Sequence, residues 1–162
     1  MEKNIEKVAV LGAGTMGAQI AGHLANAGIP SLLFDMDQEL AEKGKKTLTS
    51  LKPAPLYEAN NIELVSTWNY DEDLEKVSET DWVLEAVVER LDIKEKLYSN
   101  LLPHLKETAI LTSNTSGIPL SDLAEKLPIE VKKRFMITHF FNPPRYMQLL
   151  ELVRSEHTTE DT

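Results

Sequence analysis

The stretch that decides the fold is Val8-Ala9-Val10-Leu11-Gly12-Ala13-Gly14-Thr15-Met16-Gly17. Its leading apolar residues predict a short buried strand. Small and apolar residues then recur at helical spacing over 15–27, until Gly28 ends the pattern. A second apolar run over residues 31–34 ends at Asp35. Together these patterns predict a strand, a tight turn, a helix and a second strand.

The glycines of this stretch form a G-x-G-x-x-G pattern, which is weak evidence on its own. Here the pattern directly follows a strand and opens a helix. In that context Gly12 can make the turn, Gly14 can let the backbone approach a pyrophosphate, and Gly17 can let helix and strand pack closely. The free amides at the start of the helix, those of Thr15 and Met16, would face the phosphates. The pattern predicts a dinucleotide-binding loop.

Asp35 indicates which dinucleotide binds. A carboxylate at the end of the second strand can accept hydrogen bonds from both hydroxyls of the adenine ribose, and it would repel a 2′-phosphate. The sequence therefore favours NAD over NADP, with Asp37 as a second candidate for the same role. The alternative is that the glycines only make a tight turn and that Asp35 caps the next helix.

The rest of the chain alternates between strand and helix patterns. Further strands are predicted over residues 62–66, 82–85, 109–112, 135–138 and 147–153. Helices are predicted over residues 38–51, 71–77, 91–102 and 120–125, and a loop over 52–61. The loop follows from Pro53 and Pro55, which cannot continue a helix. Because the strands are apolar on both faces, we expect a Rossmann-type, doubly wound α/β domain with a mainly parallel sheet and helices on both faces.

Composition limits the class of protein. A chain of 162 residues that is 42% hydrophobic can bury one core, which favours a single domain. Seventeen Lys and Arg against 26 Asp and Glu give a net charge of -9, which opposes binding to nucleic acid. No cysteine is present, which fits a reducing compartment. Residues 1–7 do not resemble a secretory signal and no apolar run is long enough for a membrane helix, so we expect a soluble, cytoplasmic protein without a membrane partner.

Polar residues follow the later strands of the predicted sheet. In open α/β sheets, ligands bind beyond the carboxyl ends of the strands. The residues at those positions are Glu85-Ala86-Val87-Val88-Glu89, Ser113-Asn114-Thr115-Ser116-Gly117, and His139 with Asn142; Glu151 lies in the last predicted strand. We therefore expect them to complete a site that begins at the glycine loop.

In this order and spacing, the segments resemble the NAD-binding domain of the 3-hydroxyacyl-CoA dehydrogenase family, whose members oxidise the 3-hydroxy group in fatty-acid β-oxidation. The resemblance covers nearly the whole chain. It rests on residues 8–28 and 85–94, on Ser113-Asn114-Thr115-Ser116, and on His139-Phe140-Phe141-Asn142-Pro143 with Met147 and Glu151. Residues 52–57 also resemble members that are fused to an enoyl-CoA hydratase domain.

The resemblance implies catalytic roles for three residues. His139 would be the general base that takes the proton from the 3-hydroxyl of (3S)-3-hydroxyacyl-CoA while a hydride passes to the nicotinamide. Imidazole suits this role because it takes up and releases protons near neutral pH. Glu151 would accept a hydrogen bond from the other ring nitrogen and so fix the tautomer. Ser116 would bind the reacting oxygen or the thioester carbonyl.

The resemblance also places Glu89, Lys94 and Asn142 at positions that contact the ribose and nicotinamide end of the cofactor. Simpler explanations compete with some of these assignments. Lys94 could be an ordinary solvated lysine, and His139 an ordinary core histidine. Ser113, Thr115 and Ser116 could cap the helix that follows, and we favour that explanation for Ser113.

Other charged residues give weaker indications. Four lysines, at positions 43, 45, 46 and 52, could meet the phosphates of coenzyme A, although such charge runs are usually solvated surface. The remaining histidines have no partners at metal-ligand spacing, so no metal site is predicted: His23, His104 and His157.

The resemblance finally suggests how the chain is organised. We expect residues 1–154 to be the NAD-binding domain and residues 155–162 a frayed tail or cut linker. Longer family members continue into a helical domain that completes the substrate cleft and forms a homodimer. Alone, this chain is expected to bind NAD but to turn over substrate slowly. Two alternatives stay open, a 3-hydroxy-acid dehydrogenase of related fold that acts without CoA, and a non-catalytic NAD-binding module.

Overall fold

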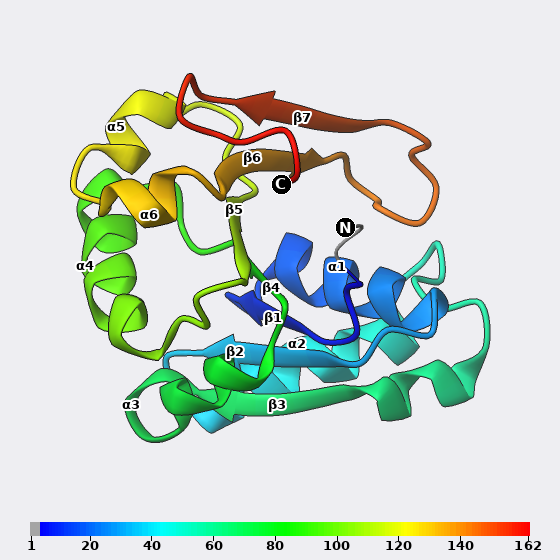
Figure 1. Ribbon diagram of the computed structural model, residues 1–162. Coiled ribbons are helices and arrows are strands. Elements are labelled where there is room, and N and C mark those ends of the chain that lie inside the picture. The colour runs from blue at the N-terminus through cyan, green and yellow to red at the C-terminus, as the bar shows by residue number, and fades with distance from the viewer. Residues whose placement is uncertain (1–3) are drawn as a thin grey trace.

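A computed structural model describes residues 4–162 as one seven-stranded sheet with helices on both faces (Figure 1). The strands are β1 (Val8–Leu11), β2 (Ser31–Asp35), β3 (Val65–Asn69), β4 (Trp82–Glu85), β5 (Ile110–Ser113), β6 (Phe135–Phe140) and β7 (Leu150–Arg154). They lie in the order β3-β2-β1-β4-β5-β6-β7. All neighbours are parallel except β6 and β7, which are antiparallel. The predicted doubly wound α/β fold is confirmed.

The helices fill the connections between the strands. The α-helices are α1 (Thr15–Asn26), α2 (Gln38–Ser50), α3 (Tyr70–Asp73), α4 (Leu91–Leu101), α5 (Leu120–Ala124) and α6 (Ile129–Lys132). Short 3-10 helices are η1 (Ala59–Leu64), η2 (Leu74–Glu79) and η3 (Leu102–His104). Within residues 4–162, no helix has both the length and the apolar character that crossing a membrane requires. The sequence expectation for Met1–Lys3 lies outside the described residues.

Two hydrophobic cores cover the two faces of the sheet. Side chains alternate between the faces of a strand, and in β1 Val8 and Val10 belong to the core that contains α1 and α2. Ala9 and Leu11 belong to the opposite core, which contains α4 and α5. All four residues of this strand are fully buried. The continuous apolar run at the start of the chain therefore serves both cores.

The predicted element boundaries needed four corrections. Residues 62–66 were predicted as a strand, but η1 occupies 59–64 and β3 starts at Val65, where it pairs with Ser31 of β2. The alternation of Ile62 and Leu64 imitates a strand because both side chains pack against the core. The predicted helix 71–77 is divided into α3 and η2, and the short α6 was not predicted.

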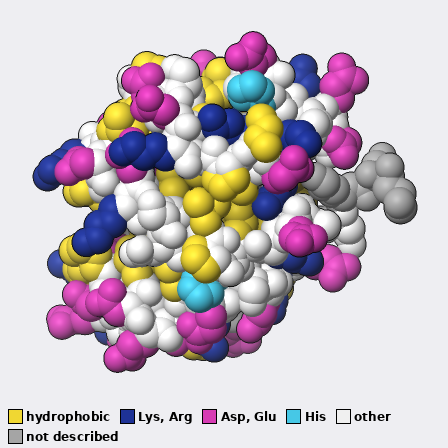
Figure 2. All heavy atoms as spheres, turned by 60° about the vertical axis from the view of Figure 1, so that its left-hand side comes forward, with side chains coloured by type: hydrophobic (Ala, Val, Ile, Leu, Met, Phe, Trp, Pro, Cys, Tyr) yellow, Lys and Arg dark blue, Asp and Glu magenta, His cyan; other side chains and the backbone are white. Residues whose placement is uncertain are grey.

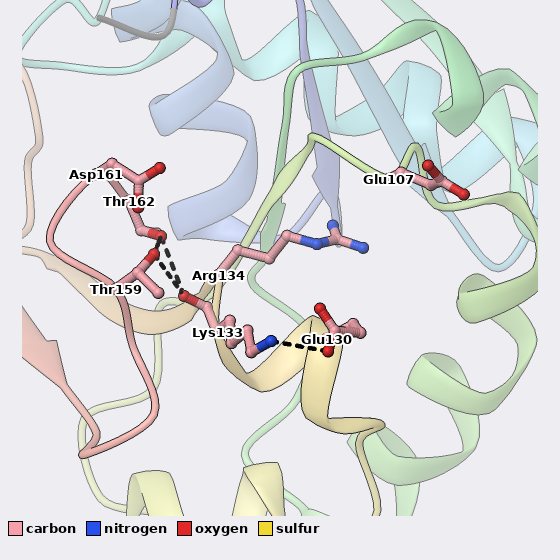
Figure 3. Close-up of a pocket in the computed structure, with 7 residues that line it drawn as sticks. All are labelled: Glu107, Glu130, Lys133, Arg134, Thr159, Asp161 and Thr162. Carbon is pink, nitrogen blue, oxygen red and sulfur yellow. Dashed lines mark hydrogen bonds and ion pairs between the residues drawn. The ribbon is translucent and has the colours of Figure 1, made fainter. Parts of the chain in front are cut away.

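The fourth correction concerns β6, which extends two residues beyond the predicted end. Pairing with β7 continues to Phe140, so His139 lies inside the strand rather than after it. Residues 155–162 fold back along the start of β6, where Thr158 Oγ1 donates to Phe135 O at 2.8 Å and Thr159 N donates to Lys133 O at 2.8 Å. Figure 3 shows Thr159 beside Lys133. The domain boundary at residue 154 stays a prediction.

A buried carboxylate connects the centre of the sheet. Glu85, at the end of β4, is completely buried and accepts four hydrogen bonds. Its Oε1 accepts from Lys94 Nζ at 2.7 Å and Val87 N at 2.8 Å, and its Oε2 accepts from Ser113 Oγ at 2.6 Å and Tyr98 OH at 2.9 Å. Burial, together with the nearby charge of Glu85, raises the pKa of Tyr98 well above its ordinary value, so its hydroxyl stays a donor.

This cluster corrects one expectation and settles a second. Ser113 does not cap a helix, because the next helix, α5, begins at Leu120 with Pro119 as its N-cap, and the Ser113 hydroxyl donates to Glu85 instead. Lys94 is 1% exposed, so it is not a solvated surface lysine. A buried charge is tolerated only when it is paired and hydrogen-bonded. The cluster therefore fixes α4 and the end of β5 against the end of β4.

The glycine loop is fixed by contact between backbones. Gly12 has φ +107°, which favours glycine, and its amide donates to Phe34 O of β2 at 2.9 Å. A Cβ on Gly17 would lie 1.7 Å from Gly12 O, whereas a Cβ on Gly14 would meet nothing within 4 Å. The predicted roles of Gly12 in the turn and Gly17 in close packing are borne out by this geometry.

We predict that Gly17→Ala lowers the free energy of unfolding by about 3 kcal/mol or more, because backbone atoms must separate to admit the methyl group. Gly14→Ala is the matched control. Gly14 has φ -66° and open space around it, so Gly14→Ala should change the free energy of unfolding by no more than about 1 kcal/mol in either direction. Urea denaturation of the two variants measures the difference. Equal stability of the two variants would contradict the contact.

We also predict that Lys94→Met lowers the free energy of unfolding by about 3–5 kcal/mol, because it leaves the Glu85 carboxylate buried without its cation. Adding Glu85→Gln should recover part of the loss. Lys96→Met, on the exposed side of the same helix, is the control. Denaturation curves for Lys94→Met and Lys96→Met that coincide would show that the buried pair does not stabilise the fold.

Candidate functional site

The site lies where parallel strands end beside the glycine loop. Asp35, at the end of β2, accepts hydrogen bonds from Ala13 N at 2.7 Å through Oδ2 and from Met36 N at 2.7 Å through Oδ1. It therefore contacts the loop directly. Asp37 caps α2 instead, since Oδ1 of Asp37 accepts from Leu40 N at 2.8 Å. The alternative in which Asp35 caps that helix is wrong.

The geometry of the loop suits a phosphate group. Gly14 precedes α1, whose first amides have no carbonyl partner within the helix. Open space at the Gly14 Cβ position leaves room for a ligand to approach the backbone. A hollow of about 290 Å³ opens here; its lining includes Gly14, Thr15, Asp35 and Lys43. The loop, the carboxylate and the free helix start fit an NAD molecule.

Of the four lysines in the basic stretch, Lys43 lines this hollow. A larger hollow of about 480 Å³ lies elsewhere, at the start of β6, and Figure 3 shows its lining residues, among them Arg134, Lys133 and Thr159. In a parallel sheet the amino ends of the strands lie on one side and the carboxyl ends on the other. Choosing the larger hollow would therefore place the site at the wrong ends of the strands, because the groups predicted to bind the ligand follow the carboxyl ends.

Glu89 organises the loop that follows β5. Its Oε1 accepts hydrogen bonds from Thr115 Oγ1 and from Gly117 N at 3.1 Å, and Ser116 N lies 3.3 Å away. Its Oε2 lies 3.3 Å from Lys94 Nζ. Burial raises the pKa of Glu89, but the Thr115 hydroxyl, the Gly117 amide and Lys94 outweigh it and hold the pKa below its ordinary value.

Glu89 and Lys94 are therefore brought together with the Ser116 loop. The Glu89 side chain is 42% exposed, whereas Lys94 is enclosed by carboxylates. Ser116 itself is exposed. Contacts of these three residues with a ligand stay predictions.

His139 and Glu151 form the predicted pair. They are directly opposite each other in the antiparallel register of β6 and β7, a position that brings side chains on one face close together. His139 Nδ1 lies 2.9 Å from Glu151 Oε2. An ionised carboxylate only accepts hydrogen bonds, so a hydrogen bond at this distance requires the proton to be on Nδ1, and in the neutral ring this leaves the lone pair on Nε2. The His139 side chain is 21% exposed and Glu151 is 52% exposed, so the pair is not part of the core.

Asn142 lies close to the first turns of α1, where its Oδ1 is 3.4 Å from Gln19 Nε2. Gln19 was not singled out from the sequence. Asn114 was quoted but given no role, although its Oδ1 accepts from Phe140 N at 2.8 Å and its amide donates to Glu85 O at 2.8 Å. A polar residue directly after a buried strand was the available signal for Asn114.

Glu85 was also missed as a central residue. The signal was a carboxylate that ends an apolar strand, Trp82–Glu85, where burial is expected. Among residues 4–162, no three His, Cys, Asp or Glu side chains gather to hold a metal ion.

Comparison with known proteins gives the family. Residues 7–162 match the family model described as "3-hydroxyacyl-CoA dehydrogenase, NAD binding domain". The chain is 43% identical over 160 residues to a putative fatty acid oxidation complex trifunctional enzyme of Rickettsia felis, with 94% of this chain and 22% of that protein covered. It is 43% identical over 161 residues to a probable 3-hydroxyacyl-CoA dehydrogenase of Deinococcus radiodurans, with 95% and 46% covered. The chain thus spans less than half the length of either relative.

Among solved structures, the chain is similar to (S)-3-hydroxybutyryl-CoA dehydrogenase PaaH1 from Ralstonia eutropha. The TM-score is 0.85 at 32% sequence identity, with 97% of this chain and 56% of that chain covered. The fold, the glycine loop with Asp35, and the family match over residues 7–162 all indicate the same family. This chain belongs to the family of NAD-binding domains of 3-hydroxyacyl-CoA dehydrogenases, and its cofactor is NAD.

Proposed function

We propose that the chain is the NAD-binding part of an enzyme that oxidises (3S)-3-hydroxyacyl-CoA to 3-oxoacyl-CoA in fatty-acid β-oxidation. The observation that carries the proposal is the His139–Glu151 pair, because it leaves Nε2 of His139 free to take a proton. The names of the relatives, among them a putative fatty acid oxidation complex enzyme, support the substrate class.

In the proposed reaction, NAD when bound accepts the hydride from C3 of the substrate. His139 Nε2 takes the proton of the 3-hydroxyl as the C–O bond becomes a carbonyl. Glu151 holds the ring through Nδ1 and stabilises the imidazolium as it forms. Ser116 hydrogen-bonds the reacting oxygen or the thioester carbonyl. The step balances because the substrate loses a hydride to NAD and a proton to His139, and the imidazolium then releases that proton to solvent before the next turnover.

A second set of residues is proposed to hold the cofactor. Gly12, Gly14 and Gly17 shape the loop, and the amides of Thr15 and Met16 face the pyrophosphate. Asp35 binds the adenine ribose, since a carboxylate that already accepts two amides still has lone pairs for hydroxyl groups. Glu89, Lys94 and Asn142 serve the ribose and nicotinamide end. The proposed role of Gly14 is supported by the open space at its Cβ position.

The domain organisation belongs to the proposal as well. Residues 1–154 would form the NAD-binding domain, and residues 155–162 would lead to a helical domain that completes the cleft and makes a homodimer. Exposed apolar side chains on the edge strand β7 support a covering partner; Leu150 is 39% exposed, Leu152 61% and Val153 46%. A cytoplasmic location and the absence of nucleic-acid partners are proposed with it. On the face in Figure 2, basic and acidic side chains are interspersed around an apolar centre.

We predict that the chain binds NADH at least about tenfold more tightly than NADPH, because Asp35 would meet the 2′-phosphate with its negative charge. Asp35→Asn should reduce this preference. Fluorescence titration of the chain with the two cofactors measures both affinities. Gly14→Ala serves as the second variant, since a methyl group in the open space should weaken NADH binding while leaving the free energy of unfolding nearly unchanged. Equal affinity for NADH and NADPH would contradict the role of Asp35.

We predict that His139→Gln, in the native polypeptide that contains this chain, lowers turnover at least about a hundredfold and leaves NADH binding intact, because only the proton acceptor is lost. Glu151→Gln should have a smaller effect. Reduction of acetoacetyl-CoA with NADH measures turnover, and a free 3-oxo acid without CoA is the comparison substrate. Unchanged turnover in His139→Gln would mean that another group is the base. Preference for the free acid would favour a dehydrogenase that acts without CoA.

A further inference from the structure

Two segments about ninety residues apart are joined by one arginine. Arg145, in the β6–β7 connection of residues 141–149, donates through Nη1 to Ala54 O at 2.7 Å and to Leu56 O at 2.5 Å. Both carbonyls belong to residues 52–57, the segment that follows α2. Figure 1 shows the connection reaching the side of the molecule where that segment lies. The contact therefore joins parts of the chain that the sheet itself does not join.

Aromatic rings enclose the guanidinium. Its carbon lies 4.5 Å from the centre of the Tyr57 ring and 5.1 Å from that of Tyr146. The Tyr146 hydroxyl adds a hydrogen bond to Ala54 O at 2.9 Å. A planar guanidinium can stack flat on rings while it donates to two acceptors, whereas a lysine ammonium has no flat face to stack. The arrangement therefore suits arginine better than lysine.

The joined segments both dock on α1, the helix that starts at the glycine loop. Asn26 binds the first segment, because its Nδ2 donates to Pro55 O at 2.9 Å and its Oδ1 accepts from Tyr57 N at 2.8 Å. Gln19 lies two turns earlier on the same face and approaches Asn142 of the second segment. Arg145 thus completes a triangle between α1, residues 52–57 and the β6–β7 connection.

We infer that Arg145 is a positioning residue that acts through Asn142. By holding the β6–β7 connection against residues 52–57, it fixes where Asn142 lies beside the first turns of α1. The inference rests on the proposed function, in which Asn142 serves the nicotinamide end of NAD. Arg145 does not touch the glycine loop or Asp35 in the contacts described for residues 4–162, so the adenosine end of the cofactor does not depend on it.

The test compares two ligands that differ at the nicotinamide end. Arg145→Ala should weaken NADH binding about tenfold and leave ADP-ribose binding within about twofold, because ADP-ribose lacks the nicotinamide. A tenfold change corresponds to about 1.4 kcal/mol. Asn142→Ala should give the same pattern. If Arg145 acts through Asn142, the double variant should bind NADH no more weakly than Asn142→Ala alone.

Three further variants keep the test decisive. Arg154→Ala removes the same charge from an exposed position on β7 and should change neither affinity. Tyr146→Phe removes only one hydroxyl, so the variant should fold normally. It should weaken the binding of NADH by about two- to threefold and leave the binding of ADP-ribose unchanged. Arg145→Lys should keep only part of the NADH affinity.

The outcomes separate the two proposals. If the unaltered chain binds neither ligand, the proposed cofactor site is wrong. Suppose that the unaltered chain binds both ligands. If Arg145→Ala and Tyr146→Phe then weaken NADH and ADP-ribose binding equally, or weaken the binding of neither ligand, the positioning role of Arg145 is wrong. Additive effects of Arg145→Ala and Asn142→Ala on NADH would also overturn it.

Discussion

The site depends on the buried carboxylate of Glu85. Four donors from the turn after β4, from α4 and from β5 converge on it, so the end of β4 cannot shift without leaving a charge unpaired in the core. The residue after Glu85 hydrogen-bonds back to β1 beside the glycine loop, through Ala86 N and Leu11 O at 2.7 Å. Lys94 extends the network to Glu89, which orders the loop that carries Ser116. One carboxylate thus sets the positions of groups from several strands.

The change from parallel to antiparallel pairing provides the second constraint. A parallel neighbour would present its own carboxyl end beside β6, but β7 runs in the opposite direction and places Glu151 directly across from His139. His139 and Glu151 are therefore held by backbone pairing rather than by loops. Asn114 secures the same end of β6 through Phe140 N. Strand register thereby determines the side-chain geometry of the pair.

The fold was predictable because hydrophobic periodicity and glycine spacing are local signals. The start of the chain, with Gly12 and Gly17, was placed correctly for that reason. Ser113 was misjudged because its partner is Glu85, 28 positions away, and local capping preference could not reveal it. His139 was placed after a strand because β6 ends only where β7 stops pairing with it. Burial of Lys94 likewise depends on tertiary contacts, which residue type and spacing alone do not determine.

The proposed base requires a free lone pair on Nε2 of His139, and therefore a proton on Nδ1. Long-range ¹H–¹⁵N correlation spectra of the histidine-labelled chain at neutral pH measure this tautomer directly, and His139→Gln assigns the signal. The Nδ1–H form is expected for His139, because Glu151 can only accept, and Glu151→Gln should reduce its population. Free imidazole in histidine favours Nε2–H, so that form at His139 in the unaltered chain would contradict the catalytic geometry.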